Sequence, residues 1–373
     1  MAAQTEIREL VHREGEYSFL LAEPGRERRV RFWGDVPAPA APRAEPALAA
    51  TLLIAMAECD DLSLPVPLSR QLCRTLPDIQ AVLRTLTAAS VATDRVLRPV
   101  GLHTPPGPPP RDVAREEADA ARAGVFFSAG VDSWSALLDN PDVTDLIYVH
   151  GFDIAVDRMD ASAPVEKIVA ATAERLGLRR HIIRTNLRAV LDPAVPWEIG
   201  HGPGLVSAAL LMAPLCARVV IGAGMTYGTL FDRGSHPLHD YLWSTEECRV
   251  EHHGAHLTRA AKVAQIAADE DVLRILRVCW ADPASYNCGR CEKCVRTMAA
   301  LEIAGELDRC PTFEPPLELD RIRALRFSDD DLLVLWRENL AFARERGAAP
   351  DLTAAIEECV AINEERLAAA QAQ

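Results

Sequence analysis

The stretch GVFFSAGVDSWSALL, residues 124–138, is the feature that most constrains the fold of this chain. Apolar residues with strand composition enter the small, hydroxyl-rich loop SAGVDS, and an apolar helical pattern follows. After this point strand and helix patterns alternate along the chain. That order predicts an α/β fold, in which a doubly wound and mostly parallel sheet carries helices on both faces.

The alternation continues with strands expected at residues 146–150 and 181–185. A helix with one apolar face separates them and is expected to end at Gly177, because glycine readily takes the left-handed conformation of a helix C-terminus. Another helix followed by a strand is expected within residues 205–221.

The two ends of the chain have a different character. Residues 16–22 and 28–33 flank a Pro-Gly turn and predict a hairpin, followed by helices around residues 48–56 and 79–86, with Pro77 in the first turn of the latter. Near the C-terminus, Ser328 is expected to cap one helix, and a second helix is expected within residues 351–370. The predicted domains are a small α+β accessory domain at 1–102, a proline-rich linker at 103–118, a catalytic domain at 119–315 and a helical extension at 316–373.

Composition excludes several classes of protein. A formal net charge of -14 argues against a broad basic surface for nucleic acid. Pro214 and Arg218 interrupt the longest apolar stretch, residues 205–224, so that helix followed by strand fits better than a membrane span. The N-terminal residues MAAQTEIREL lack an apolar export signal, so we expect a cytoplasmic protein whose clustered cysteines bind metal.

The loop at residues 128–133 has the composition of a phosphate site. At the carboxyl end of a parallel strand, a loop that opens a helix directs backbone N–H groups and the helix dipole toward one point. Gly130 allows close approach, and Ser128 and Ser133 add hydroxyl donors. Asp132 is expected to orient the loop or to help hold Mg²⁺. The three lysines of the chain follow Glu or Ala, which excludes a Walker loop, and the spacing of glycines does not fit the dinucleotide fingerprint.

Four of the ten cysteines form a C-x8-C-x2-C-x2-C array, which consists of Cys279, Cys288, Cys291 and Cys294. Thiolates at this spacing can complete a closed, structural zinc site, with Gly289 relaxing the turn between two ligands. Disulfides, free thiols and an iron–sulfur cluster are the alternatives. The remaining six cysteines are expected to be buried small hydrophobes.

The loop resembles the Ser-Gly-Gly-x-Asp-Ser motif of the PP-loop ATP pyrophosphatases, a Rossmann-like group that cleaves ATP between its α and β phosphates. Ala129 stands where that family usually has glycine, and its methyl group fits only if its backbone angles are ordinary for a non-glycine residue. With the cysteine array, residues 122–310 resemble the 7-cyano-7-deazaguanine synthases.

That resemblance implies a ligase that activates a carboxylic acid, possibly of a deazapurine, as its adenylate and forms an amide or nitrile with ammonia. It implies ATP, Mg²⁺ and Zn²⁺ as cofactors. Its implied nucleotide contacts are Ser128, Ala129, Gly130, Val131, Asp132, Ser133, Val149, His150, Gly151 and Gly222.

The substrate side rests on two polar segments, residues 201–204 and 222–240, that bracket the fourth expected strand. The candidates for substrate or magnesium contacts are His201, Asp232, Arg233, His236 and Asp240. Asp132, Ser133, His201 and Asp232 are the predicted catalytic residues. The segment EHHGAH, residues 251–256, is interpreted as an exposed turn. Arg290 and Arg296 are either anion contacts or solvated charges.

Two other functions remain open at this point. One is a sulfur-transferring PP-loop enzyme that acts on tRNA, which the acidic charge balance disfavours. The other is a non-catalytic ATP-binding interaction module. The N-terminal region could also recognise a peptide or protein acceptor.

Overall fold

Contacts divide the chain into two compact units in the computed structural model, which describes residues 4–90, 93–107, 122–279, 281, 285–313, 316–327 and 329–371. The first, here called the sheet unit, comprises Met1–Phe127, Asn140–Ala223 and Asp232–His253. The second, the helical unit, comprises Ser128–Asp139, Gly224–Phe231 and Gly254–Gln373. The loop at 128–133 therefore groups with the helical unit.

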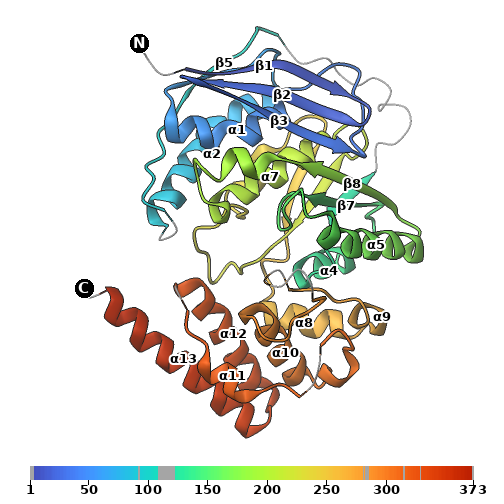
Figure 1. The fold of residues 1–373 in the computed structure, drawn as a ribbon, viewed down its shortest axis with the longest axis vertical. Coiled ribbons are helices and arrows are strands. Elements are labelled where there is room, and N and C mark those ends of the chain that lie inside the picture. The colour runs from blue at the N-terminus through green and yellow to red at the C-terminus, as the bar shows by residue number, and fades with distance from the viewer. Residues whose placement is uncertain are drawn as a thin grey trace. The chain divides into compact units, whose positions relative to one another are not determined.

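The described part of the sheet unit forms one ten-stranded sheet in the order β10-β9-β6-β7-β8-β3-β2-β1-β4-β5. Figure 1 shows β1, β2 and β3 side by side and continuing into β8 and β7. Pairing is parallel from β10 to β8, antiparallel from β8 through β3 and β2 to β1, and parallel again to β4 and β5. The predicted α/β class with a mostly parallel sheet is confirmed. The strands are β1 (Gln4–Arg13), β2 (Glu16–Glu23), β3 (Arg26–Gly34), β4 (Asp61–Ser63), β5 (Gly101–His103), β6 (Ala123–Phe126), β7 (Asp145–His150), β8 (Arg179–Thr185), β9 (Arg218–Gly222) and β10 (Arg249–His253).

Strand β7 is buried on both faces, as parallel strands between helices are. Ile147 and Val149 point into the core that α1 (Glu45–Glu58) and α7 (Trp197–Leu211) share. Tyr148 faces the other way, and its hydroxyl lies 3.3 Å from that of Ser162 on α5 (Met159–Leu176). Alternate side chains of one strand thus contact helices on opposite faces, as the sequence predicts.

Several predicted element ends are confirmed. α5 ends at Gly177 with φ of 66°, in the left-handed region. The stretch 205–224 is the end of α7 followed by β9. Among the described residues, no helix combines the length and apolarity that crossing a membrane requires. Two short elements complete this unit, α6 (Leu187–Leu191) and the 3-10 helix η1 (Asp240–Trp243).

The position predicted for Pro77 is wrong. Helix α2 (Arg70–Ala89) begins earlier, because the Ser69 side chain accepts a hydrogen bond from the Leu72 N–H and caps it. Pro77 consequently lies inside the helix rather than in its first turn.

The predicted hairpin is confirmed as β2 and β3, and it extends the same sheet because Phe32 of β3 pairs with Thr185 of β8. Residues 1–102 therefore contribute strands to a sheet that continues into the rest of the unit. The division into accessory and catalytic domains stays a prediction, and most of the predicted linker, residues 108–118, lies outside the described residues.

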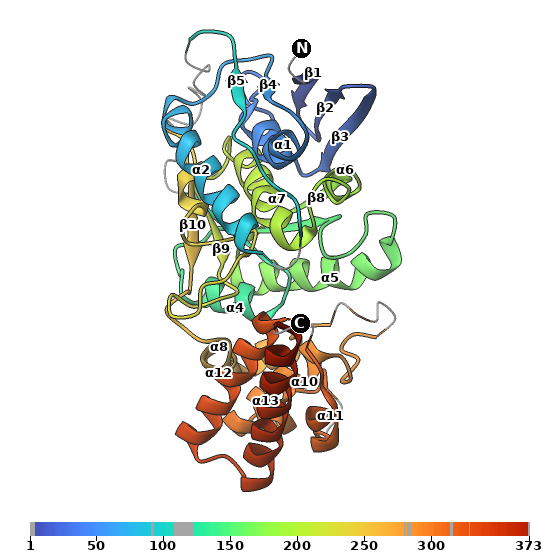
Figure 2. The ribbon, with the colours of Figure 1, turned by 90° about the vertical axis from the view of Figure 1, so that its left-hand side faces the viewer.

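The helical unit contains α4 (Val131–Leu138), α8 (Arg259–Ala267), α9 (Glu270–Leu273), α10 (Glu292–Ala304), η2 (Leu307–Arg309), α11 (Leu319–Ala324), α12 (Asp330–Arg346) and α13 (Pro350–Gln371). α8 packs against α4, α10 and α12, and α13 packs against α11 and α12 (Figure 2). The predicted helical C-terminus is confirmed. Asp329 caps α12 by accepting from the Leu332 N–H, whereas Ser328 lies outside the described residues.

Candidate functional site: an anion loop and a four-cysteine centre

The loop at residues 128–133, between β6 and α4, is closed by one of its own hydroxyls. The Ser133 Oγ accepts from the Ser128 N–H at 3.3 Å and donates to the Gly130 carbonyl at 2.9 Å. Gly130 is the N-cap of α4 and has an extended backbone, and no side chain of the described residues caps this helix. The N-terminal N–H groups of α4 are therefore left to another partner.

Ala129 has a φ of 61°, in the left-handed region that glycine favours. The expectation that Ala129 has backbone angles ordinary for a non-glycine residue is therefore wrong. The side chain is fully buried, and the carbonyl accepts a hydrogen bond from the Arg277 N–H at 3.1 Å. An alanine in this conformation is strained by about 1–2 kcal/mol, so its surroundings must hold it there.

Asp132 forms an ion pair with α8 of the same unit. Its Oδ2 lies 2.5 Å from Arg259 Nη1, and its Oδ1 lies 3.7 Å from Lys262 Nζ. Burial opposes ionisation of Asp132, but the charges of Arg259, Lys262 and Lys293 outweigh it and lower the pKa of the carboxyl group. Asp132 is therefore ionised and connects the loop to α8 through ion pairs. This arrangement fits the first of its two predicted roles, which was to orient the loop.

Four cations act on Asp132 and are here called the cation group: Arg259 and Lys262 on α8, and Lys293 and Arg296 on α10. The Lys262 side chain is only 2% exposed, and burial lowers its pKa. Carboxylates of Asp132, Glu292 and Glu338 lie among these charges. Among the described residues named here, four cations face three carboxylates, a balance that favours an additional anion.

Arg296 is the member of the cation group with the most buried guanidinium atoms that have no hydrogen-bond partner among the described residues. The residue is 5% exposed, and its Nε and Nη1 atoms have no hydrogen-bond partner among the described residues. Glu292 Oε1 lies 3.4 Å from Nε, as an ion pair without hydrogen-bond geometry. Buried guanidinium N–H groups normally have acceptors, so an anion would satisfy this side chain.

The sequence left Arg290 and Arg296 as either anion contacts or solvated charges. In the structure Arg296 is buried, whereas Arg290 is exposed. Sequence reasoning missed Arg259 and Lys262 altogether. One signal was present: only three residues of this arginine-rich chain are lysines, and two of them belong to the cation group.

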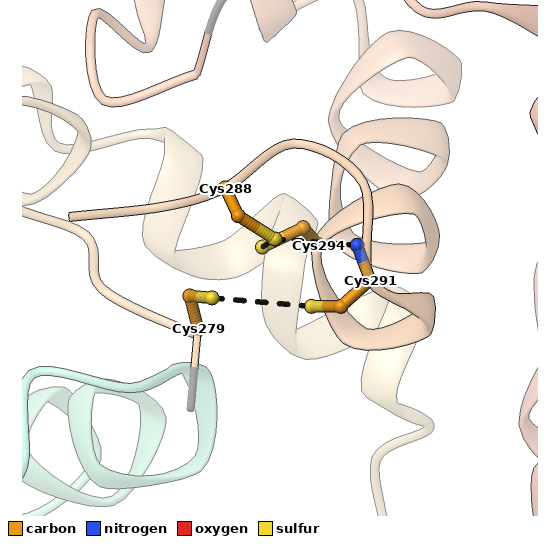
Figure 3. A group of neighbouring side chains, drawn as sticks. All are labelled: Cys279, Cys288, Cys291 and Cys294. Carbon is orange, nitrogen blue, oxygen red and sulfur yellow. Dashed lines mark hydrogen bonds between the residues drawn. The ribbon is translucent and has the colours of Figure 1, made fainter. Parts of the chain in front are cut away.

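The four cysteines of the array converge on one point (Figure 3). Their sulfur atoms all lie within 4.8 Å of one another, with 4.0 Å between Cys279 and Cys291 and 3.9 Å between Cys288 and Cys294. Sulfurs about 2.3 Å from a central tetrahedral ion lie roughly 3.8 Å apart. The cluster therefore fits a metal ion such as zinc.

The backbone around Cys288 is also arranged for a metal thiolate. Its Sγ accepts from the Cys291 N–H at 3.3 Å and from the Arg290 N–H at 3.5 Å. These bonds require the tight turn at Gly289, whose φ is 63°, as predicted. Without metal, hydrogen bonding from Cys294 lowers the pKa of Cys291 to about 5, while the pKa of Cys294 is raised by the same bond.

The prediction for the remaining cysteines is wrong at one position. Cys73 is exposed, since it lies on the outer side of the amphipathic helix α2. The others are buried as expected: Cys59, Cys216, Cys248, Cys310 and Cys359.

In the sheet unit, the predicted nucleotide contacts Val149, His150 and Gly151 lie at the carboxyl end of β7, and Gly222 ends β9. Gly151 has a φ of 112°, and a Cβ there would lie 2.0 Å from the Thr185 carbonyl oxygen, so the position requires glycine. Its N–H is engaged with the Ile154 carbonyl at 3.0 Å.

The predicted substrate residues of the sheet unit are partly brought together around Asp240, which is fully buried. Its carboxylate accepts from the Ser235 hydroxyl at 2.6 Å and the His236 N–H at 3.1 Å, and it lies 2.8 Å from His252 Nδ1. Burial and the charge of the neighbouring His239 lower the pKa of His236 to about 4. We call Ser235, His236, His239, Asp240 and His252 the Asp240 cluster.

His201 joins this cluster through the backbone. Its Nε2 accepts from the Ser235 N–H at 3.2 Å, and its Nδ1 lies 3.1 Å from the carbonyls of Trp197 and Glu198. Both ring nitrogens of this predicted catalytic residue are therefore occupied. Asp232 and Arg233 are partly buried, and the described hydrogen bonds of the cluster do not include Asp232.

The interpretation of residues 251–256 as an exposed turn is wrong for its first half. His252 and His253 belong to β10, which pairs in parallel with β9. The side chain of His252 is 3% exposed, because alternate residues Val250 and His252 point inward. Its Nε2 has no hydrogen-bond partner among the described residues.

In comparisons with known proteins, no family model, curated protein or solved structure matches the chain.

Proposed function

We propose that the chain is an ATP-dependent ligase of the PP-loop kind, which activates a carboxylic acid as its adenylate and then joins it to ammonia. The observation that supports this most directly is the buried guanidinium of Arg296, on which the charge of Asp132 acts and whose Nε and Nη1 have no hydrogen-bond partner in the part of the chain that the structure describes. A polyanion such as the pyrophosphate portion of ATP would satisfy it. The loop at 128–133 would add backbone N–H groups.

The proposed chemistry needs no covalent nucleophile from the protein. A substrate carboxylate oxygen attacks the α-phosphorus, the bond to the bridging oxygen of pyrophosphate breaks, and pyrophosphate leaves. Ammonia then attacks the acyl carbon, the acyl–oxygen bond breaks, AMP leaves, and one proton passes to solvent. A nitrile would require a second activation at the amide oxygen. Mg²⁺, if bound with ATP, would neutralise phosphate charge.

The cation group would stabilise the departing pyrophosphate, because fixed positive charge is most useful where negative charge develops. The same role explains why Lys262 and Arg296 remain buried although burial disfavours their charged forms. A 7-cyano-7-deazaguanine synthase-like substrate, a deazapurine acid, is the first candidate from the sequence resemblance, and peptide C-termini are the second.

The test is a pyrophosphate-exchange screen against deazapurine acids, amino acids and peptide C-termini, followed by product analysis with ammonia. The expected products are AMP and pyrophosphate, formed only with an acid. Release of ADP would contradict the proposal, as would failure of the metal-loaded protein to bind pyrophosphate. The full chain is needed, since deleting residues 1–102 would remove the β3 partner of β8.

Two arginine variants sharpen this test. Arg296→Met should weaken pyrophosphate binding at least ~10-fold, because a charged bidentate donor is lost. Arg290→Met is the matched control on an exposed side chain and should change binding less than about twofold. Arg296→Met should lower the stability of the fold by no more than about 1 kcal/mol, since it removes an unsatisfied buried group. Equal effects of the two variants on pyrophosphate binding would contradict the assignment.

A further inference from the structure

A short backbone segment connects the four-cysteine site directly to the loop at 128–133. The Arg277 N–H donates to the Ala129 carbonyl at 3.1 Å, and Cys279, a predicted metal ligand, follows two residues later. A Cβ at Gly130 would lie 3.7 Å from the Arg277 carbonyl oxygen. The two segments are therefore joined by one backbone hydrogen bond, and Gly130 faces the Arg277 carbonyl beside it.

Asn287 holds this segment rigidly. Its Oδ1 accepts from the N–H groups of Val278 and Cys279 at 2.9 and 3.1 Å, and its Nδ2 donates to the Leu276 carbonyl at 2.8 Å. Asn287 itself precedes the ligand Cys288. One of the two hydrogen-bonded segments ends at Cys279 and the other at Cys288. A metal ion bound by both cysteines would therefore fix both segments.

Helix α10 provides a second connection. Cys291 is its N-cap residue and Cys294 lies in its first turn. Lys293 and Arg296 of the cation group lie in the same two turns. Metal coordination would therefore also fix the beginning of the helix that carries these two cations.

The loop needs such support because Ala129 is held in a conformation that alanine disfavours. We propose that metal at the four-cysteine site clamps the loop in its anion-binding conformation through the Arg277–Ala129 hydrogen bond, so that metal occupancy and anion affinity are coupled. The identity of the anion rests on the proposed function; the clamp itself does not. Coupling of this kind is reciprocal, so anion binding should also tighten metal binding.

The experiment compares the full chain loaded with zinc, after chelation, and after zinc is restored. Hydrogen exchange measured by mass spectrometry should accelerate at least ~10-fold after chelation in peptides covering residues 128–138 and 274–279, and recover with zinc. Inorganic pyrophosphate should bind about 10-fold more weakly to the chelated protein, the factor expected when a loop strained by an alanine relaxes.

Two variants separate the clamp from simple loss of folding. Asn287→Ala keeps all four cysteines and should still bind one zinc ion, yet it should show the faster exchange and the weaker pyrophosphate binding. Asn186→Ala is the matched control, because Asn186 also bonds two backbone groups, those of Arg31 and Arg29, but lies in the sheet unit. It should change neither readout.

Unchanged exchange in both peptides after chelation would overturn the clamp, and it would leave the proposed function standing if pyrophosphate still binds. Failure of the zinc-loaded protein to bind pyrophosphate would overturn the proposed function, while the exchange data would still decide the clamp. Loss of protection throughout α12 and α13 would show that metal folds the entire helical unit, which would also overturn a clamp specific to the loop.

Discussion

The substitution Ala129→Gly tests the loop conformation on which the site depends. Glycine accepts a φ of 61° without strain, so the change should recover about 1–2 kcal/mol. It also removes a buried methyl group, which loses about 0.8 kcal/mol, and adds about 0.4–1 kcal/mol of chain entropy to the unfolded state. These terms nearly cancel. We expect a stability within about 1 kcal/mol of the parent protein.

Ala136→Gly provides a matched control. Ala136 is 1% exposed and Ala129 is 0% exposed, and both belong to the segment Ser128–Asp139. Ala136, however, lies inside α4 with ordinary helical geometry. Its replacement should lose the same methyl burial and about 1 kcal/mol of helix propensity, for a total of about 2 kcal/mol. The two alanines should therefore respond differently to an identical chemical change.

Urea unfolding followed by circular dichroism, with zinc saturating in every sample, would measure both variants against the parent protein. If Ala129→Gly destabilises the protein as much as Ala136→Gly does, Ala129 does not occupy the left-handed region, and the argument for a strained loop fails. Pyrophosphate binding of Ala129→Gly should stay within about twofold of the parent, because the loop keeps the same backbone path.

Three further predictions concern other parts of the molecule. Native mass spectrometry should find one zinc ion per chain and Cys291→Ser should reduce that content; a coloured, iron-containing protein would contradict the zinc assignment. Asp145→Asn should destabilise the fold by about 3 kcal/mol in urea unfolding, because it leaves Arg122 without its buried counter-charge and alters the 2.7 Å contact with His181 Nε2, and a loss under about 1 kcal/mol would refute this. The pKa of His236 is about 4 in the folded chain against 6.5 ordinarily, so the unfolded chain binds the extra proton and stability should fall as the pH drops from 6.5 to 4. His236→Asn, which can still accept the Leu238 N–H bond, should lose about 3 kcal/mol less over that range; an identical pH slope would show that His236 does not cause it.

Much of the parallel sheet was predictable because its signals are local. β7 is a continuous apolar run, and α5 combines one apolar face with Gly177 at its end. The start of α2 was not predictable from Pro77 alone. Ser69 caps the helix, but nothing local distinguishes it from the other serines of the chain that could act as a cap. Pairing of β3 with β8 depends on segments about 150 residues apart, which no local pattern reports.

The site divides in the same way. The cysteine cluster follows from spacing, since ligands two residues apart can reach one ion with little help from the rest of the fold. The cation group depends on the packing of α8 against α4 and α10, so Arg259 and Lys262 could not be assigned to the loop from sequence. His252 was assigned to a turn because the sequence around it is polar. Its burial in a strand depends on Asp240, a partner that lies 12 residues earlier and that no local pattern identifies.

Two features of the helical unit are hard to explain if residues 128–133 merely connect a strand to a helix. Ala129 is held with a positive φ although many residues with ordinary angles would make such a turn, and Arg296 is buried with N–H groups that no described residue accepts from. Each disfavours the folded state by about 1–3 kcal/mol, a substantial fraction of the stability of a typical domain. Ala129 lies three residues before Asp132, and the charge of Asp132 acts on Arg296. Strain and unpaired donors in one neighbourhood are what the proposed anion site would require, because such a site is organised before its ligand arrives. A metal ion held by Cys279 and the other three cysteines, two residues from Arg277, would supply the rigidity that such an arrangement needs, which is why metal loading and anion affinity should be measured together.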